Sequence, residues 1–323
     1  MELEIDEARS LSLRALVATG LPTDSAEIVT DHLIDAHCCG QTFAGLPRLL
    51  VMLDRVRQVP EEDLGRTELT RETESSALLD GRGNLGYITC QRAIEVGIRK
   101  AETSPIVLVG AFNSRYSGRL GYYTEQAARQ GLIALHVTAA APSVAAAGGT
   151  RPILGTNPIC VALPTSDCPV ICDLTTAATA MGELDLAART GSALAEGLAI
   201  DSAGKPTTDP VAALEGAILP WGGHKGYALA LAVAGLSILA GGEAVPGSFG
   251  SWGYLFIVIR GDAFLSMDEF IRRMDELVRR VRKSSDDIRI PGERSAAARE
   301  RALASGRINV PRAVVEALRA EVG

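Results

Sequence analysis

Residues 148–165 read GGTRPILGTNPICVALPT, and this segment joins a loop of turn-forming residues to a short apolar run. The loop half, GGTRPILGTNP, is dense in glycine, proline and small hydroxyl or amide side chains. Loops of this composition expose backbone N–H groups, which suit a phosphate or a carboxylate. Taken alone, the loop is better explained as a long structural turn, so its significance depends on the segments around it.

Strand-like and helical runs alternate on both sides of this segment. Short apolar runs predict buried strands, and longer amphipathic runs predict helices. We expect helices at residues 87–103, 120–129 and 264–282, and strands at residues 105–111, 132–138, 159–163, 170–173 and 255–260, with a short strand and turn from about residue 76.

The two ends of the chain have a helical pattern instead. Helical periodicity marks residues 3–20, 24–39 and 46–57, and the tail at 297–322 predicts one or two short helices. We therefore expect three parts: a helical N-terminal part at residues 1–75, a helical tail at residues 285–323 that packs with it, and a central sheet domain at residues 76–284.

The composition is that of an ordinary globular protein, with 47% hydrophobic and 22% charged residues among 323. A net charge of −7 argues against nucleic-acid binding, which needs a basic face. The N-terminus lacks a signal-peptide pattern, and the most apolar stretch, residues 227–240, is too short to span a membrane. We expect a cytoplasmic protein whose six scattered cysteines are reduced core residues and hold no metal.

Two further glycine turns combine backbone N–H groups with positive charge. Residues 221–227, WGGHKGY, place Lys225 at the start of an apolar helix expected at residues 228–240, a favourable place for an anion. Residues 290–294, IPGER, form another turn near the tail with one acidic and one basic side chain, and alone this turn indicates no function. Residues 81–86, GRGNLG, match a dinucleotide fingerprint only superficially, because no acidic residue follows about twenty positions later at a strand end.

In order and wording, several segments resemble the malate/L-lactate dehydrogenase family, which includes ureidoglycolate dehydrogenase, diketogulonate reductase, sulfolactate dehydrogenase and the cyclic imino acid reductases. The resemblance runs from about residue 30 to about residue 310. It is carried by residues 113–135, 148–165, 171–191, 196–210, 219–231 and 289–294.

The resemblance implies an α/β (α+β) fold that is not a Rossmann fold, with a mixed, largely antiparallel sheet flanked by helices. It also implies a homodimer with the active site near the interface, and a central domain that binds NADH or NADPH. Which of the two cofactors is used stays open. The family's cofactor-binding positions fall on Thr156, Asn157, Asp173, Leu174, Thr175, Thr176, His224, Lys225, Gly226, Gly292, Glu293 and Arg294.

The family's reaction transfers a hydride from nicotinamide to the carbon of a C=O or C=N bond next to a carboxylate. A histidine donates the proton, and an arginine, here Arg48, holds the carboxylate, a task suited to its bidentate guanidinium. This chain departs from the pattern at the substrate pocket. The family's serine and catalytic histidine fall on Phe43 and Ala44, a second histidine falls on Tyr116, and the usual lysine falls on Glu183.

None of the four histidines replaces the missing proton donor. His37 lies seven residues before Ala44 and is better explained as a buried helix residue than as a displaced acid. His32 and His136 are expected to be structural, and His224 to lie on the cofactor side.

Three functions remain open at this point. The favoured one is an NAD(P)H-dependent reductase of a cyclic imino acid, because a protonated imine already carries its activating proton, whereas general acid catalysis is worth about 10²–10⁴-fold. Arg48 would hold the substrate carboxylate, and Tyr116 or Asp173 would supply a proton or steady the iminium charge. The alternatives are an NAD(P)-binding homologue with non-redox or transient-redox chemistry, and a catalytically inactive scaffold dimer.

Overall fold

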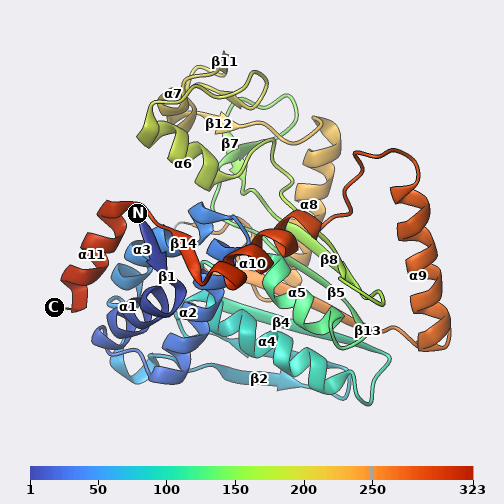
Figure 1. The fold of residues 1–323 in the computed structure, drawn as a ribbon. Helices are drawn as coiled ribbons and strands as arrows, with labels where there is room; N and C mark the ends of the chain where they lie inside the picture. The colour runs from blue at the N-terminus through green and yellow to red at the C-terminus, as the bar shows by residue number, and fades with distance from the viewer. Residues whose placement is uncertain (248–250, 323) are drawn as a thin grey trace.

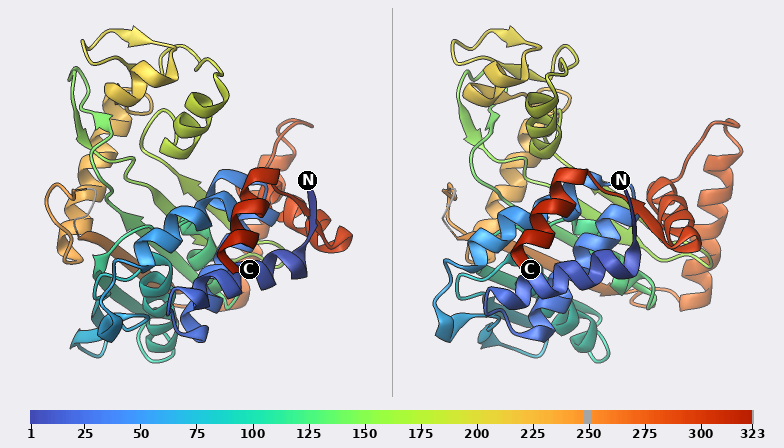
Figure 2. Two further views of the ribbon diagram at one scale, coloured as in Figure 1. Left: turned by 90° about the vertical axis from the view of Figure 1, so that its left-hand side faces the viewer. Right: turned by 60° about the vertical axis from the view of Figure 1, so that its left-hand side comes forward.

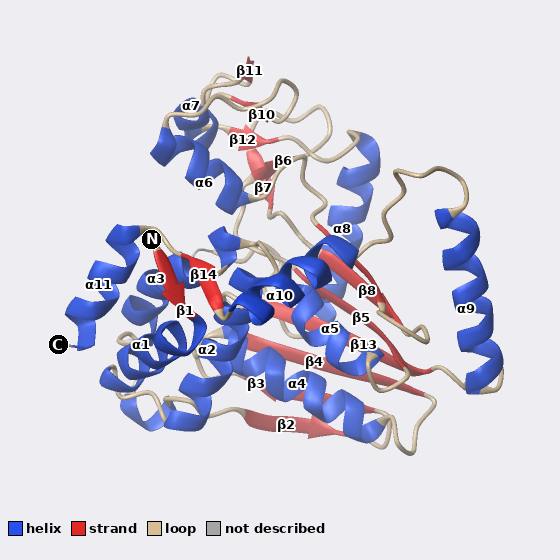
Figure 3. Ribbon diagram, viewed as in Figure 1, coloured by secondary structure: helices blue, strands red, loops and turns tan. Residues whose placement is uncertain are grey.

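The computed structural model describes residues 1–247 and 251–322, and its centre is a seven-stranded sheet (Figures 1 and 3). Among its described strand pairs, only β3 and β4 run parallel, and the others run antiparallel. The expected mixed, largely antiparallel sheet is thereby confirmed. In sheet order the strands are β2 (Glu68–Glu72), β3 (Ser76–Asp80), β4 (Ile106–Ser114), β13 (Trp252–Arg260), β5 (Leu132–Thr138), β8 (Ile159–Leu163) and β9 (Val170–Leu174).

Helices cover both faces of this sheet. On one face, α4 (Gly86–Lys100) and α5 (Leu120–Ala128) pack on the buried side chains of β4 and on Phe256 of β13. On the other face, α8 (His224–Leu239) packs against Leu255, the next residue along β13. Successive strand residues point to opposite faces, so β13 contributes to both cores, as its continuous apolar sequence requires.

Residues 81–86 connect β3 to α4, and β3, α4 and β4 form a parallel strand–helix–strand unit. The segment therefore does lie between a strand and a helix, although the sequence indicated only a weak strand. Its loop is filled by the buried Asn84 side chain, whose amide donates to the carbonyl oxygens of Asp63, Arg66 and Gly81. The turn is thus held by the protein's own polar groups.

The first and last parts of the chain share one core. Strand β1 (Glu2–Glu4) pairs antiparallel with β14 (Arg307–Asn309), and the helices on either side bury apolar residues together (Figure 2). Leu16, Leu33, Leu53 and Leu318 all lie in this cluster, from four different helices. The helices are α1 (Ile5–Ala18), α2 (Thr23–Cys38), α3 (Leu46–Val56) and α11 (Arg312–Val322), with α10 (Glu293–Ser305) lying against α2.

A second, small sheet stands apart from the main one, at the top of Figure 1. Its strands have two or three residues each, too few to show an alternating pattern, and the sequence did not predict them. It has its own core around Val144 and Leu184. The elements are β6 (Val144–Ala145), β7 (Pro152–Leu154), β10 (Ala199–Ile200), β11 (Pro206–Thr207), β12 (Ala217–Ile218), α6 (Met181–Thr190) and α7 (Pro210–Glu215).

The long helix α9 (Met267–Arg282) begins three residues later than the sequence indicated. Ser266 explains the difference, because its hydroxyl accepts a hydrogen bond from the Glu269 backbone N–H at 3.3 Å and caps the helix. No helix in the described part of the chain has the length and apolar character needed to cross a membrane.

Candidate active site

A cavity of about 470 Å³ lies where the N-terminal helices, the main sheet and the small sheet meet. We call it the Arg48 cavity. Its lining includes Ala44, Arg48, Tyr116 and Thr156, which the sequence placed in the site, and Asp185, which it did not. Residues as far apart in the chain as Ala44 and Asp185 thus share one space, because 3₁₀ helix η1 (Thr42–Ala44) contacts α6 of the small-sheet part.

Arg48 projects from the first turns of α3, and its guanidinium has no acidic partner. The guanidinium lies over the Tyr116 ring, 5.5 Å from its centroid, and it forms no hydrogen bond or ion pair with any described residue. A cation held by an aromatic face keeps its N–H donors free. The arrangement therefore leaves Arg48 able to receive a carboxylate through two parallel hydrogen bonds.

Tyr116 occupies a strained backbone position. Its φ of 63° lies in the left-handed region that a bulky residue rarely adopts. The ring contacts Arg48 and also Trp252, whose ring centroid lies 5.2 Å away. Strain of this kind persists only where surrounding contacts impose it, and it concentrates at functional sites.

Helix η1 places Ala44 on the wall of the Arg48 cavity. The neighbouring Phe43 closes the wall against α6, since a Cβ atom added at Gly182 would lie 2.4 Å from the Phe43 ring. Among the described residues, no histidine lines this cavity. Phe43 and Ala44 thus give the cavity an apolar wall, and Tyr116 presents an aromatic ring to Arg48.

The histidines that are buried have structural partners elsewhere. His37 lies on α2, and its Nε2 atom is 2.8 Å from the carbonyl oxygen of Asn309. His32 accepts a hydrogen bond from the Arg119 backbone N–H, and His136 stacks on Phe256 with ring centroids 3.8 Å apart. Burial lowers the pKa of all three, and that of His136 falls to about 3. They therefore remain uncharged at neutral pH and lie outside the Arg48 cavity.

Asp185 is the functional candidate that sequence reasoning missed. It lies on α6, lines the Arg48 cavity, and its carboxylate forms no hydrogen bond or ion pair with any described residue. A carboxylate and a guanidinium that both lack partners thus face one cavity. The only sequence signal was the unusual acidic pair Glu183 and Asp185 on one helix, and no pattern indicated which of the two would face inward.

The loop at residues 155–157 is tied to β9 and to α8. The Thr156 carbonyl oxygen accepts hydrogen bonds from the hydroxyls of Thr175 and Thr176, each at 2.9 Å. The buried Asn157 amide accepts from the Ala140 N–H and donates to the Ala230 carbonyl oxygen. These polar side chains hold the loop against its neighbours, so that Thr156 reaches the cavity wall.

The glycine turn before α8 adjoins the same threonines. The Trp221 N–H donates to the Thr176 carbonyl oxygen, and the Gly226 N–H donates to the Trp221 carbonyl oxygen. Gly223 has a φ of 64°, and a Cβ atom added there would have open space around it. His224 and Lys225 are exposed at the N-terminus of the helix and do not line the Arg48 cavity.

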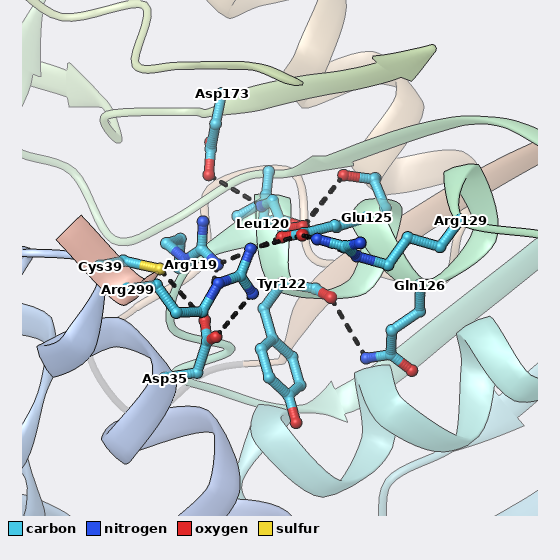
Figure 4. Close-up of polar contacts among 12 residues, drawn as sticks. Asp35, Cys39, Arg119, Leu120, Tyr122, Glu125, Gln126, Arg129, Asp173 and Arg299 are labelled. Carbon is cyan, nitrogen blue, oxygen red and sulfur yellow. Dashed lines mark hydrogen bonds and ion pairs between the residues drawn. The ribbon is translucent and has the colours of Figure 1, made fainter. Parts of the chain in front are cut away.

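A second cavity, also about 470 Å³, lies between β9, the N-terminus of α5 and the first turn of α10. We call it the Arg119 cavity. It is lined by Arg119, Arg129 and Arg299 together with Glu125, and Figure 4 shows these side chains converging with Asp35. Arg119 and Arg299 both bind Asp35, at 2.7 and 2.9 Å, and Arg129 and Arg299 both bind Glu125.

The ion pairs of this network are largely shielded from water. The side chains of Arg119 and Glu125 are only 5% and 8% exposed. Burial opposes the ionisation of Glu125, but its bonds to Arg299 and Arg129 outweigh that effect and lower its pKa. Since a buried charge is tolerated only when paired, the network fixes α2, α5 and α10 relative to one another.

The other residues assigned to the cofactor lie around the Arg119 cavity. Asp173 and Leu174 line it from β9, and the Asp173 carboxylate accepts a hydrogen bond from the Gly121 N–H in the first turn of α5. Burial raises the Asp173 pKa. Gly292 and Arg294 also line the cavity, next to β9, since the carbonyl oxygen of Pro291 accepts a hydrogen bond from the Ile171 N–H. Asp173 therefore faces a different cavity from Arg48 and Tyr116.

Comparison with known proteins gives consistent matches over nearly the whole chain. The model of the family described as malate/L-lactate dehydrogenase matches residues 3–319. A malate/(S)-sulfolactate dehydrogenase of Methanothermus fervidus is 36% identical over 306 residues, covering 91% of this chain and 89% of its own. A delta(1)-pyrroline-2-carboxylate reductase of Ancylobacter novellus is 32% identical, covering 99% of this chain and 97% of its own.

Solved structures agree with these matches. The crystal structure of delta1-piperideine-2-carboxylate reductase from Pseudomonas syringae pvar. tomato superposes with a TM-score of 0.90. Its sequence is 29% identical, and the match covers 99% of each chain. The fold described above is therefore shared with this reductase.

Proposed function

The chain belongs to the malate/L-lactate dehydrogenase family, and from this premise we propose that it is an NAD(P)H-dependent reductase of a cyclic imino acid. As a member of this family, the protein is an oxidoreductase that uses NAD(P). The choice of an imino acid rests on one observation. The Arg48 cavity holds an unpaired arginine and no histidine among its described lining residues.

The residues present suit a dinucleotide. The turn at Gly222 and Gly223 leads into the N-terminus of the 16-residue helix α8, with open space beside Gly223 and Lys225 in the first turn of the helix, which favours an anion. We propose that the nicotinamide end reaches the Arg48 cavity, where it supplies the hydride. The residues proposed to hold the cofactor are Thr156, Asn157, Asp173, Leu174, Thr175, Thr176, His224, Lys225, Gly226, Gly292, Glu293 and Arg294.

An imino acid needs less from the pocket than a keto acid does. Reduction of a C=O bond creates an alkoxide that must receive a proton, and general acid catalysis of such a step is worth about 10²–10⁴-fold. Ala44 has no proton to give. A protonated C=N bond accepts hydride at carbon and becomes a neutral amine nitrogen, so no proton donor is required in that step.

Asp185 supports the same choice by its charge. A protonated cyclic imino acid carries a carboxylate and a cationic nitrogen, and the Arg48 cavity offers an unpaired guanidinium and an unpaired carboxylate. We propose that Arg48 binds the substrate carboxylate and that Asp185 stabilises the positive nitrogen. Both groups are partly exposed in the described structure, so each is available to a ligand.

A substrate panel tests this proposal. The purified protein is given Δ1-piperideine-2-carboxylate, Δ1-pyrroline-2-carboxylate, oxaloacetate and sulfopyruvate with NADH and with NADPH, and cofactor oxidation is followed by absorbance. We expect the imines to be reduced with a kcat/KM at least about tenfold above the keto acids. Asp185→Asn should erase much of that advantage, whereas Glu215→Gln, an exposed carboxylate on α7, should leave it intact. Preference for a keto acid would refute the proposal.

Restoring the family histidine gives a complementary test. Ala44→His should raise keto-acid reduction by about tenfold or more, because it returns a general acid to the cavity wall. The ratio of keto-acid to imine activity is the quantity to measure. If Ala44→His leaves that ratio unchanged, the missing histidine is not what separates the two substrate classes.

We also propose that the protein is a homodimer. Helix α8 exposes Leu231, Ile238 and Leu239, which are 55%, 47% and 68% exposed, on an otherwise apolar helix. Exposed apolar side chains grouped on one element indicate an interaction surface. Light scattering after gel filtration measures the mass directly, and a single 33.9 kDa species would contradict the proposal.

A further inference from the structure

We propose that the Arg119 cavity binds the 2′-phosphate of the cofactor, so that this protein binds NADPH in preference to NADH. The inference rests on the proposed function, since it assumes that a nicotinamide dinucleotide is the ligand. Neither membership of the family nor the sequence motifs decide between NADPH and NADH.

The cavity has more positive than negative side chains on its walls, in a chain whose net charge is −7. The carboxylates that line it are already bonded. Glu125 is shared between Arg129 and Arg299, and Asp173 accepts from the Gly121 N–H. Two of the arginines, Arg289 and Arg294, form no hydrogen bond or ion pair with any described residue. The charge in the cavity that no ion pair neutralises is therefore positive.

A buried donor in the same wall also lacks a partner. Arg119 is 5% exposed, and its Nη2 atom binds Asp35, but its buried Nε–H has no hydrogen-bond partner among the described residues. Leaving a charged donor unpaired away from water is costly, so such a group indicates a ligand or an ordered water. Arg119 lines the cavity into which a ligand would come.

The backbone contributes in the same direction. The first turn of the 13-residue helix α10 lines the cavity through Arg294 and Ser295, after Gly292 with a φ of 99°. The N-terminus of a helix presents free N–H groups and the positive end of its dipole. Side chains, an unpaired buried N–H and a helix terminus thus all favour a phosphate in one place.

The charged side chains that line the cavity also argue against NADH. In Rossmann-fold dehydrogenases a carboxylate binds the ribose 2′-hydroxyl of NAD, whereas an arginine accommodates the 2′-phosphate of NADP, and the same charge preference applies to a 2′-phosphate in any site. Among the described lining residues of the Arg119 cavity, Glu125 is paired with arginines and Asp173 accepts the Gly121 N–H, whereas Arg289 and Arg294 have no partner. The cavity also borders Asp173, Leu174 and Gly292, the segments proposed to hold the cofactor.

Calorimetric titration of the full chain tests the inference without relying on turnover. The probes are NADPH, NADH and the fragment adenosine 2′,5′-bisphosphate, against wild type, the double variant Arg289→Gln/Arg294→Gln, and Arg312→Gln as a distant exposed control. We expect NADPH to bind wild type at least tenfold more tightly than NADH. The double variant should lose about 10- to 100-fold for NADPH and for the fragment, and less than threefold for NADH.

The outcomes separate this inference from the proposed function. Equal affinity of wild type for NADPH and NADH, or an equal loss for both in the double variant, would overturn the inference and leave the reductase proposal standing. Binding of neither dinucleotide would overturn both. Circular dichroism confirms the fold of each variant, and because both arginines are exposed, their replacement should not disturb it.

Discussion

The Arg48 cavity and the Arg119 cavity have the same volume, about 470 Å³, but Arg48 in the first and Arg119 and Arg299 in the second are held in opposite ways. Arg48 lies over an aromatic ring and has no acidic partner. Arg119 and Arg299 are fixed by the carboxylates of Asp35 and Glu125. The contrast shows how one residue type serves two purposes, since a paired arginine stabilises the fold and an unpaired one keeps its charge for a ligand.

Breaking the ion-pair network around Arg119 should have the largest effect, and that effect should be on the free energy of unfolding. Arg119→Met leaves the Asp35 and Glu125 carboxylates short of a buried partner, and removal of one member of a buried ion pair costs about 3–5 kcal/mol. Urea denaturation followed by circular dichroism measures the free energy of unfolding. Arg272→Gln, a 61% exposed arginine on α9, is the control and should change it by less than about 0.5 kcal/mol. Similar losses in the two variants would remove the distinction between the network and the surface.

Replacement of Arg48 should weaken substrate binding and leave the stability of the fold almost unchanged. Arg48→Ala should raise KM for a carboxylate substrate by about 10- to 150-fold, since a hydrogen bond to a charged group is worth about 1.5–3 kcal/mol. Arg48→Lys keeps the charge without the bidentate geometry, and should fall between wild type and Arg48→Ala. Steady-state kinetics and thermal unfolding are measured on the same samples. An unchanged KM would place the substrate carboxylate elsewhere.

Acid should destabilise the Arg119 side of the molecule. His32 is buried next to Arg119, and burial, with a smaller contribution from the arginine charge, keeps its pKa well below 6.5. As pH falls below about 6.5 the unfolded chain binds a proton that the folded chain refuses, so stability present above that pH is lost. The loss from one such residue is about 1.4 kcal/mol per pH unit.

The depressed pKa of Glu125 adds to this loss below 4.5, because protonation removes the charge that its arginines bind. His32→Gln retains a group able to accept the Arg119 N–H bond but does not titrate. It should therefore reduce the dependence of unfolding free energy on pH between about pH 6.5 and about pH 5. His224→Gln, an exposed histidine, is the control. Identical pH dependence in all three proteins would show that His32 is protonated equally in both states.

Replacement of the Tyr116 ring, which lies against Arg48, should have the smallest effect, and that effect should be on KM. Tyr116→Leu removes a cation–π contact worth about 0.5–1 kcal/mol, so KM should rise by about two- to fivefold, while Tyr116→Phe keeps the ring and should restore most of the loss. The pair of variants is compared by steady-state kinetics with one imine. A much larger loss of kcat in Tyr116→Phe would assign the hydroxyl a proton-transfer role and would weaken the case for a self-activated substrate.

The main sheet and its helices could be predicted because their periodicity is long. The strands expected at residues 132–138 and 159–163 match β5 and β8 residue for residue. The small sheet could not, since strands such as Val144–Ala145 are too short to alternate. Strand β2 was missed because all its residues are exposed and it looks like a polar loop.

Some residues of the site could likewise be predicted from the sequence, and others could not. Arg48, Ala44 and Thr156 were found through motifs, which mark positions along the chain. The network was not, because Asp35 meets Arg119 and Arg299 across 84 and 264 positions of sequence. Asp185 was missed for a related reason, since its place on the cavity wall depends on how α6 docks against Phe43. Contacts of this range follow from tertiary packing and leave no local pattern.

The pairing of β1 with β14 bears on how the protein is made. Leu3 shares a core with Ile308 and Val315, so during synthesis α1 and α2 lack the partners that complete their core until β14 and α11 have also been translated. Apolar surface that stays uncovered during synthesis is prone to aggregation. Contacts between residues so far apart in sequence also slow folding. The N-terminal part can therefore close only after β14 and α11 have left the ribosome.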